Sequence, residues 1–176
     1  MKTLIEEIKR AITLEEKGYE FYAKTAAKTN NPLVGSTFSS LADREMVHIK
    51  RIKELYQELS GEKKLASDWL KGVEVAPSKK ELLKPILNKL KKDLNKKFKT
   101  ADDITNAYGI GQALEQGSFM LYEKIAKESN DEKIKKFYTA LAQEEKEHYD
   151  ILTESLQYLN NPAEWFKQQE HWILEG

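Results

Sequence analysis

Apolar residues recur every three, four or seven positions along four long stretches of the chain, a spacing typical of one face of an α-helix. These stripes cover residues 5–26, 34–59, 104–126 and 134–158. Asn30-Asn31-Pro32 separates the first two stripes, and the tight turn Ser129-Asn130-Asp131 separates the last two. Gly61 follows the second stripe and Asn161-Pro162 the fourth, and such residues commonly follow the end of a helix. The pattern predicts four long helices, joined in pairs by short loops.

Short loops make the two helices of a pair antiparallel neighbours, whereas a long connection lets the second pair join in the reverse sense. We therefore expect an all-α four-helix bundle within a single domain, residues 1–176. Its parts are a first αα-hairpin (2–60), a crossover (61–101), a second αα-hairpin (102–160) and a short C-terminal helical tail (161–176). Leucines and isoleucines between residues 82 and 94 predict a short helix inside the crossover.

The two hairpins are copies of one another. Residues 14–26 read LEEKGYEFYAKTA and residues 114–126 read LEQGSFMLYEKIA. LADREMVH at 41–48 pairs in the same way with LAQEEKEH at 141–148. No gap is needed anywhere in this alignment. Duplication of one hairpin is the simplest explanation, and it predicts pseudo-twofold symmetry about the bundle axis.

Six ionisable residues occupy positions in the apolar stripes, near the middle of each predicted helix. They are Glu15, Glu45, His48, Glu115, Glu145 and His148. A buried carboxylate without a partner costs several kcal/mol, and four such groups also repel one another. Two imidazolium groups would balance only half of this charge. Two divalent metal ions would balance all of it and leave both imidazoles neutral as ligands.

The spacing of these residues also suits a metal. The Glu and His of each Glu-x-x-His motif lie three residues apart on one helix face, so both can approach one ion. Oxygen-rich ligation with one imidazole per metal favours iron or manganese over structural zinc. A single Glu-x-x-His is more often a surface pair, and the competing explanation for all six residues is a buried salt-bridge network. The stripe positions of Glu15 and Glu115 favour the dinuclear metal site.

Two further pairs lie on the same faces. Tyr22 and Tyr122 follow the first-helix and third-helix Glu by two turns. They are either core aromatics or groups that hydrogen-bond a ligand or donate one electron during oxidation. Gly18 and Ser118 follow the same Glu residues by one turn. They either leave room for a small oxidant or allow close helix packing.

Composition narrows the remaining possibilities. Lys+Arg and Asp+Glu both number 29 and Cys is absent, so the net charge is zero and disulfides or Cys-ligated metals are excluded. We expect a cytoplasmic protein that binds neither nucleic acid nor membrane. The lysine-rich segment 78–99 is interpreted as a solvated face, with docking of an acidic redox partner as the alternative. Trp165, Phe166 and Trp172 are expected to pack on the bundle or a dimer partner, and His171 is interpreted as a non-ligand.

The motifs LEEKGYEFY (14–22), LADREMVH (41–48), ALEQGSFMLY (113–122) and LAQEEKEH (141–148) resemble those of the rubrerythrin branch of the ferritin-like superfamily. The closing NPAEWFKQQEHW is similar to tails in that group. A Glu from each of two helices, plus Glu-x-x-His from each of the other two, is the ligand set of ferritin-like di-metal proteins. The resemblance implies a di-iron centre that reacts with hydrogen peroxide or dioxygen.

The resemblance also implies a role for each residue. Glu15 and Glu115 would be terminal ligands, Glu45 and Glu145 would bridge the metals, and His48 and His148 would each bind one iron. Rubrerythrins usually append a rubredoxin domain with four Cys, which this sequence lacks. Many also carry an extra Glu where this chain has Ser118, so the ligand set looks more like that of bacterioferritin.

The leading hypothesis is a di-iron oxidoreductase, a non-haem peroxidase or oxidase that reduces hydrogen peroxide or dioxygen. A separate electron donor such as a rubredoxin would serve it, and a homodimer is expected. Three other functions stay open: ferritin-like iron oxidation and storage, a di-manganese catalase or oxidase, and a metal-free helical interaction protein.

Overall fold

Four long helices account for nearly all of the residues that the computed structural model describes, which are 2–62, 64–65, 69–72 and 102–162. They are α1 (Lys2–Lys28), α2 (Pro32–Leu59), α4 (Asp102–Glu128) and α5 (Glu132–Asn160), with a short 3-10 helix, η1, at Trp69–Gly72. These residues contain no strand. The predicted all-α class is confirmed.

The helices begin and end at residues suited to those positions. The side chain of Asn31 accepts hydrogen bonds from the backbone N–H groups of Leu33 and Val34, at 3.0 and 3.3 Å, and so caps the start of α2. Asp131 caps α5 in the same way. Gly61 follows α2 with a φ of 76°, a left-handed conformation that favours glycine.

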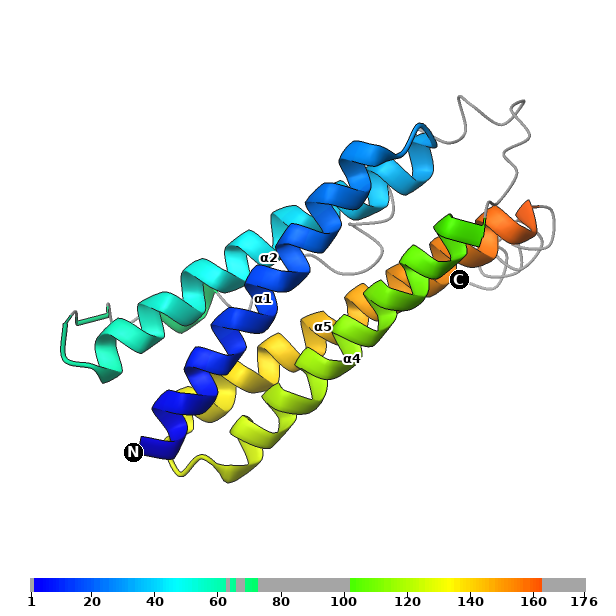
Figure 1. The fold of residues 1–176 in the computed structure, drawn as a ribbon. Helices are drawn as coiled ribbons and strands as arrows, with labels where there is room; N and C mark the ends of the chain where they lie inside the picture. Colours follow the sequence, from blue (N-terminus) through cyan, green and yellow to red (C-terminus); the bar gives the residue numbers. More distant parts are fainter. Residues whose placement is uncertain (1, 63, 66–68, 73–101, 163–176) are drawn as a thin grey trace.

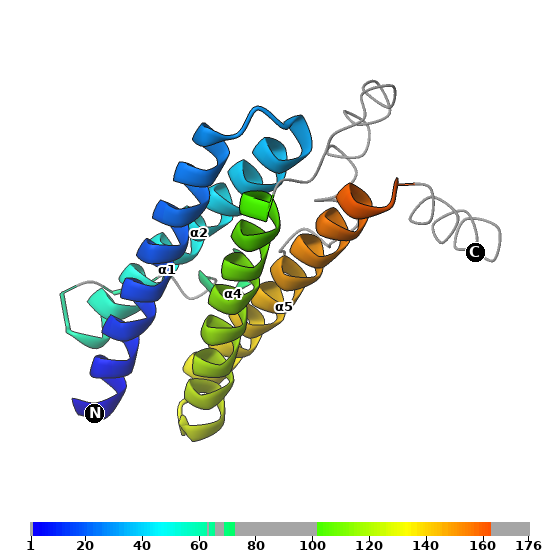
Figure 2. The same cartoon turned by 45° about the vertical axis from the view of Figure 1, so that its right-hand side comes forward.

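The helices form two antiparallel hairpins that pack face to face (Figures 1 and 2). Helix α1 lies against α4, and α2 lies against α5. Helix α2 ends at the end of the bundle opposite to the one where α4 begins (Figure 1). This arrangement of the two hairpins is that of the ferritin-like four-helix bundles.

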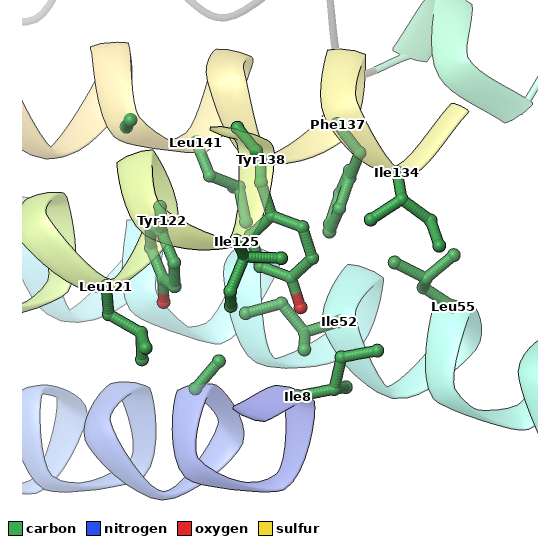
Figure 3. Packing of buried hydrophobic residues seen from close by; sticks show 13 residues of the cluster. Ile8, Ile52, Leu55, Leu121, Tyr122, Ile125, Ile134, Phe137, Tyr138 and Leu141 are labelled. Carbon is green, nitrogen blue, oxygen red and sulfur yellow. The ribbon is translucent and has the colours of Figure 1, made fainter. Parts of the chain in front are cut away.

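Two apolar clusters fill the bundle, one toward each end. The first contains Ile8 of α1, Ile52 and Leu55 of α2, Tyr122 of α4 and Tyr138 of α5, together with their neighbours (Figure 3). The second is built around Tyr22, Phe38, Tyr108 and Leu152. On every helix, the six ionisable residues singled out above fall between the members of these two clusters. The packing thus leaves a polar layer at mid-length.

One expectation is wrong, and others concern residues outside the described parts of the chain. Tyr19 is part of the first apolar stripe, yet its side chain is 38% exposed, because it lies at the edge of the buried face. The short helix predicted at 82–94, the lysine-rich segment 78–99 and the aromatic tail with His171 lie outside the described residues. The division into hairpins, crossover and tail stays a prediction. None of the described helices is long and apolar enough to cross a membrane.

Candidate metal centre

The structure brings together all six of the ionisable residues that the sequence places on the core stripes. Helices α1 and α4 contribute one Glu each, and helices α2 and α5 contribute one Glu and one His each. The exposed fraction of every one of these residues lies between 0% and 3%: Glu15, Glu45, His48, Glu115, Glu145 and His148. Such burial of six ionisable groups needs compensation from one another or from a bound cation.

Each histidine turns its Nδ1 atom toward carboxylates. His48 Nδ1 lies 3.1 Å from Glu15 Oε2 and 3.0 Å from Glu145 Oε1. His148 Nδ1 lies 3.4 Å from Glu115 Oε2 and somewhat farther from both other carboxylates of its group. The two imidazole rings stack, with centroids 5.5 Å apart. The same nitrogen faces inward in both copies, as pseudo-twofold symmetry requires.

Two overlapping groups of ligand atoms are close enough to hold a metal ion. One group consists of Glu15, Glu45 and His48, and the other of Glu45, Glu115, Glu145 and His148. Within each group, one ligand atom per residue lies within 4.8 Å of the others. Glu45 belongs to both groups, so its two carboxylate oxygens could reach two neighbouring ions.

Each buried tyrosine bonds a glutamate of the opposite hairpin. The Tyr22 hydroxyl donates to Glu115 Oε1, and the Tyr122 hydroxyl donates to Glu15 Oε1. Burial, followed by the nearby carboxylate charge, raises the pKa of both tyrosines well above 10, so both keep their protons. These bonds hold one oxygen of each glutamate and leave the other oxygen directed at the histidine.

Glu15 and Glu115, the glutamates of α1 and α4, ionise readily despite their burial. Burial alone would raise the pKa of Glu15, but a hydrogen bond with Glu45 and the charge of His48 outweigh it and lower this pKa to about 2. Burial opposes ionisation of Glu115 too, and the charge of His148 beside it lowers that pKa below its usual value. Both groups are therefore carboxylates at neutral pH.

The two central glutamates behave in the opposite way. Burial, followed by the negative charge of Glu15, raises the pKa of Glu45 and of Glu145 well above 4.5. Burial tends to lower the pKa of His48, but the charges of Glu15 and Glu145 raise it well above 6.5. Without a cation, these surroundings thus favour the protonated forms of Glu45, Glu145 and His48.

Several buried polar atoms of the cluster have no hydrogen-bond partner among the described residues. They are Glu115 Oε2, Glu145 Oε1, and both ring nitrogens of His148. Buried polar atoms in folded proteins are nearly always satisfied, and an orphaned one costs about 1–3 kcal/mol. Carboxylate oxygens and neutral imidazole nitrogens are the donors that iron and manganese accept. The residues present fit a metal centre.

The sequence reading missed Glu144, which lies one residue before Glu145. Its Oε2 atom accepts a hydrogen bond from His48 Nε2 at 3.0 Å and another from the guanidinium of Arg44. Arg44 and Glu144 occupy equivalent positions of the two repeats, and their opposite charges were a signal that the two would meet near the symmetry axis. Glu144 is 7% exposed and lies next to the six-residue cluster, in contact with His48.

His48, Glu144 and His148 also lie close enough together to form a third group of ligand atoms. A neutral imidazole has only one nitrogen lone pair, and Nδ1 of each ring already faces the inner carboxylates. Coordination through both nitrogens would require loss of the remaining proton. This group is better described as a hydrogen-bonded layer outside the cluster.

The two small residues, Gly18 and Ser118, are both buried. A Cβ atom placed on Gly18 would lie 3.4 Å from both Cδ and Oε2 of Glu45, so this glycine faces the cluster at ordinary contact distance. Ser118 is buried, with 7% of its side chain exposed. Whether either residue leaves room for an oxidant stays a prediction.

Two antiparallel hairpins, packed into a bundle around buried carboxylates and imidazoles, define a ferritin-like protein with a cluster compatible with a metal site. The family model described as Rubrerythrin matches residues 6–156, most of the chain, and the protein therefore belongs to the rubrerythrin family. Comparisons with curated proteins and with solved structures gave no match.

Proposed function

We propose that this chain is a di-iron oxidoreductase of the rubrerythrin type, which reduces hydrogen peroxide to water at a buried dinuclear centre. The observation that carries the proposal is a fully buried cluster of four glutamates and two histidines, whose ligand atoms lie close enough together to hold metal ions. Ion-pair contacts alone leave His148 Nε2 without a partner among the described residues and bring four carboxylates together around only two imidazoles, whereas two metal ions would balance all four carboxylates. Membership of the rubrerythrin family supports the choice of iron.

In this proposal the two repeats contribute equally. Glu15 and Glu115 are terminal ligands, and the bonds from the two buried tyrosines hold them in place. Glu45 and Glu145 bridge the metals, and binding displaces the protons that these two groups otherwise keep. His48 and His148 each bind one iron through Nδ1, the nitrogen that faces the carboxylates.

When bound, two Fe(II) ions would supply the two electrons that reduce hydrogen peroxide, and two protons would complete the two water molecules. The four carboxylates balance the charge of the metals, and the burial of the cluster keeps bulk water away from them. Tyr22 and Tyr122 keep their hydroxyl protons directed at Glu115 and Glu15. Gly18 keeps side-chain atoms away from Glu45, where a small oxidant would approach.

A separate one-electron donor such as a rubredoxin would return the two electrons, because the chain has no Cys to build a Cys-ligated iron centre. Dioxygen is the competing oxidant. Manganese is the competing metal, since carboxylate and imidazole ligands suit both ions.

The test is anaerobic loading with Fe(II), followed by stopped-flow mixing with hydrogen peroxide or with dioxygen. The near-ultraviolet absorption of the oxidised centre would be recorded. We expect oxidation by peroxide to be much faster than oxidation by dioxygen. Comparable or faster oxidation by dioxygen would indicate an oxidase or an iron-storage role instead, and no absorption change with either oxidant would contradict a working di-iron centre.

A matched pair of variants tests the residues. Glu145→Ala removes a proposed bridging ligand, whereas Glu123→Ala removes an exposed glutamate of α4. We expect the first variant to lose iron and peroxide turnover and the second to keep both. Normal iron content and turnover in Glu145→Ala would overturn the ligand assignment. Metal analysis of the protein from its native host would decide between iron and manganese.

A further inference from the structure

The two histidines of the cluster are alike on their inner side and different on their outer side. Nδ1 of both faces the inner carboxylates. Nε2 of His48 lies 3.0 Å from Glu144 Oε2 and donates to it. Nε2 of His148 is buried and has no hydrogen-bond partner within the described parts of the chain. Hydrogen bonds therefore hold the His48 ring at both nitrogens, whereas the His148 ring has ion-pair contacts at Nδ1 and no partner at Nε2 among the described residues.

The cause of this difference between the histidines is one difference in sequence between the repeats. The residue equivalent to Glu144 in the first repeat is Arg44. A guanidinium has only donors and cannot accept a hydrogen bond from an imidazole N–H. Arg44 instead donates to the same Glu144 oxygen that His48 uses, and the two side chains are largely buried, with exposed fractions of 17% and 9%. The charges of Arg44 and Glu144 neutralise each other, and only His48 gains a hydrogen-bond acceptor from this pair.

This exchange matters for metal binding because a metal-binding imidazole needs an acceptor for its other N–H. A carboxylate in that place fixes the tautomer and the ring orientation and makes the ring a stronger ligand, and its removal typically costs about 10–100-fold in metal affinity. Glu144 provides this support to His48. No carboxylate is bonded to Nε2 of His148 among the residues that the structure describes.

We propose that the exchange of Arg44 for Glu144 makes the two metal positions unequal, so that the position at His48 fills first and the position at His148 fills second. Glu144 acts here as a positioning residue, through His48. This order of filling rests on the proposed dinuclear centre. The six ligand residues alone do not provide it, because both repeats supply the same residue types.

The experiment is an anaerobic titration with Co(II), followed by visible absorption and by calorimetry. Two variants isolate one position each: His148→Ala keeps the His48 position, and His48→Ala keeps the His148 position. We expect the wild-type protein to bind two Co(II) ions in separate steps. We expect His148→Ala to bind its ion about 10–100-fold more tightly than His48→Ala does.

Exchanging the pair is the sharper test. The double variant Arg44→Glu/Glu144→Arg preserves the charge pair and moves the carboxylate to the side of His148. In this background the order of the two single-position affinities should reverse. Glu144→Gln, a nearly isosteric change that is less demanding on folding, should weaken only the position at His48. Circular dichroism of each metal-free variant would check that the helices remain intact.

The outcomes separate the two proposals. Equal affinities in the two single-histidine variants, or no change in Glu144→Gln, would overturn the inequality while leaving the dinuclear centre in place. Failure of the wild-type protein to bind Co(II) at all would overturn the dinuclear centre, and the inequality with it. Separate steps that reverse in the exchanged variant would support both.

Discussion

Hairpin α1–α2 and hairpin α4–α5 carry the same residue types at the centre of the bundle and different ones immediately around it. Each contributes two Glu, one His and one Tyr to the buried layer, and the tyrosine bonds run reciprocally between the hairpins. Outside this layer the hairpins differ at many positions, among them Ile8 and Tyr108, Gly18 and Ser118, Phe38 and Tyr138, and Arg44 and Glu144.

This comparison separates what a dinuclear site requires from what it tolerates. Two metals of equal charge need equal neutralisation, so both repeats must supply the same carboxylates and imidazoles. The surrounding positions carry no such constraint, and they can make the two halves unequal without removing a ligand. Equivalent substitutions in the two hairpins should therefore have similar effects within the buried layer and different effects at the surrounding positions.

The largest effect is expected from removing the central carboxylates. Glu45→Ala and Glu145→Ala should each reduce iron content to one ion per chain or fewer, because either loss removes a bridge and leaves the charge of two metals unbalanced. Metal analysis after anaerobic loading measures this. Losses of very different size in the two variants would break the equivalence of the inner layer.

A smaller effect concerns pH and the metal-free protein. Because Glu45, Glu145 and His48 have a raised pKa in the folded state, the folded chain binds more protons than the unfolded one. Their contribution to stability is complete below the unfolded pKa values, 4.5 for the carboxyls and 6.5 for the imidazole, and is lost as the pH rises through the folded values. The free energy of unfolding should therefore fall as the pH rises above these unfolded values, by up to about 1.4 kcal/mol per pH unit for each proton.

Urea unfolding in the presence of a chelator would measure this slope. Glu45→Gln and Glu145→Gln should flatten it to a similar extent and make the metal-free protein more stable at high pH. Glu15 has a lowered pKa, so its contribution is present above 4.5 and is lost as the pH falls toward about 2. A metal-free stability that rises with pH above 6.5 would contradict the raised pKa values of Glu45, Glu145 and His48.

A further effect is expected from the two tyrosines that each donate a hydrogen bond to a glutamate of the opposite hairpin. Tyr22→Phe and Tyr122→Phe each delete a hydroxyl that donates to a buried carboxylate, and such bonds contribute about 1.5–3 kcal/mol. We expect losses of this size in the free energy of unfolding, nearly equal for the two variants. Tyr19→Phe, at an exposed position of α1, is the control and should change little. A loss confined to one of the buried tyrosines would show that the symmetry does not extend to these bonds.

The smallest effect is expected at the small residues. Gly18→Ala should stabilise the metal-free protein by up to about 1 kcal/mol, since alanine favours the helix. Its added Cβ would lie 3.4 Å from Glu45, so we expect oxidation by peroxide to become a few-fold slower. Ser118→Ala is the matched change in α4 and should affect both quantities less. Thermal unfolding and stopped-flow rates measure them, and an unchanged rate in Gly18→Ala would favour the helix-packing interpretation.

Much of this fold could be predicted from the sequence because the repeat is strict. The gapless offset of one hundred residues and the turn and capping residues near Asn31 and Asp131 predicted four helices in two hairpins. The six inner residues were found because each interrupts an apolar stripe, and the structure places all six in one buried layer.

Other features could not be read along a single helix. Arg44 and Glu144 lie beside the stripes, where charged residues normally face solvent, and their contact joins α2 to α5 across the bundle. The exposure of Tyr19 depends on the width of the interface, which periodicity does not determine. Burial, pairing between helices and the protonation of Glu45 and Glu145 all follow from packing in three dimensions.

X-ray absorption spectroscopy of the anaerobically iron-loaded protein tests the central claim most directly. A dinuclear centre predicts oxygen and nitrogen ligands around each iron and a second iron at a distance of about 3.5–4 Å. Iron surrounded by the same light atoms, but with no neighbouring iron, would contradict the account.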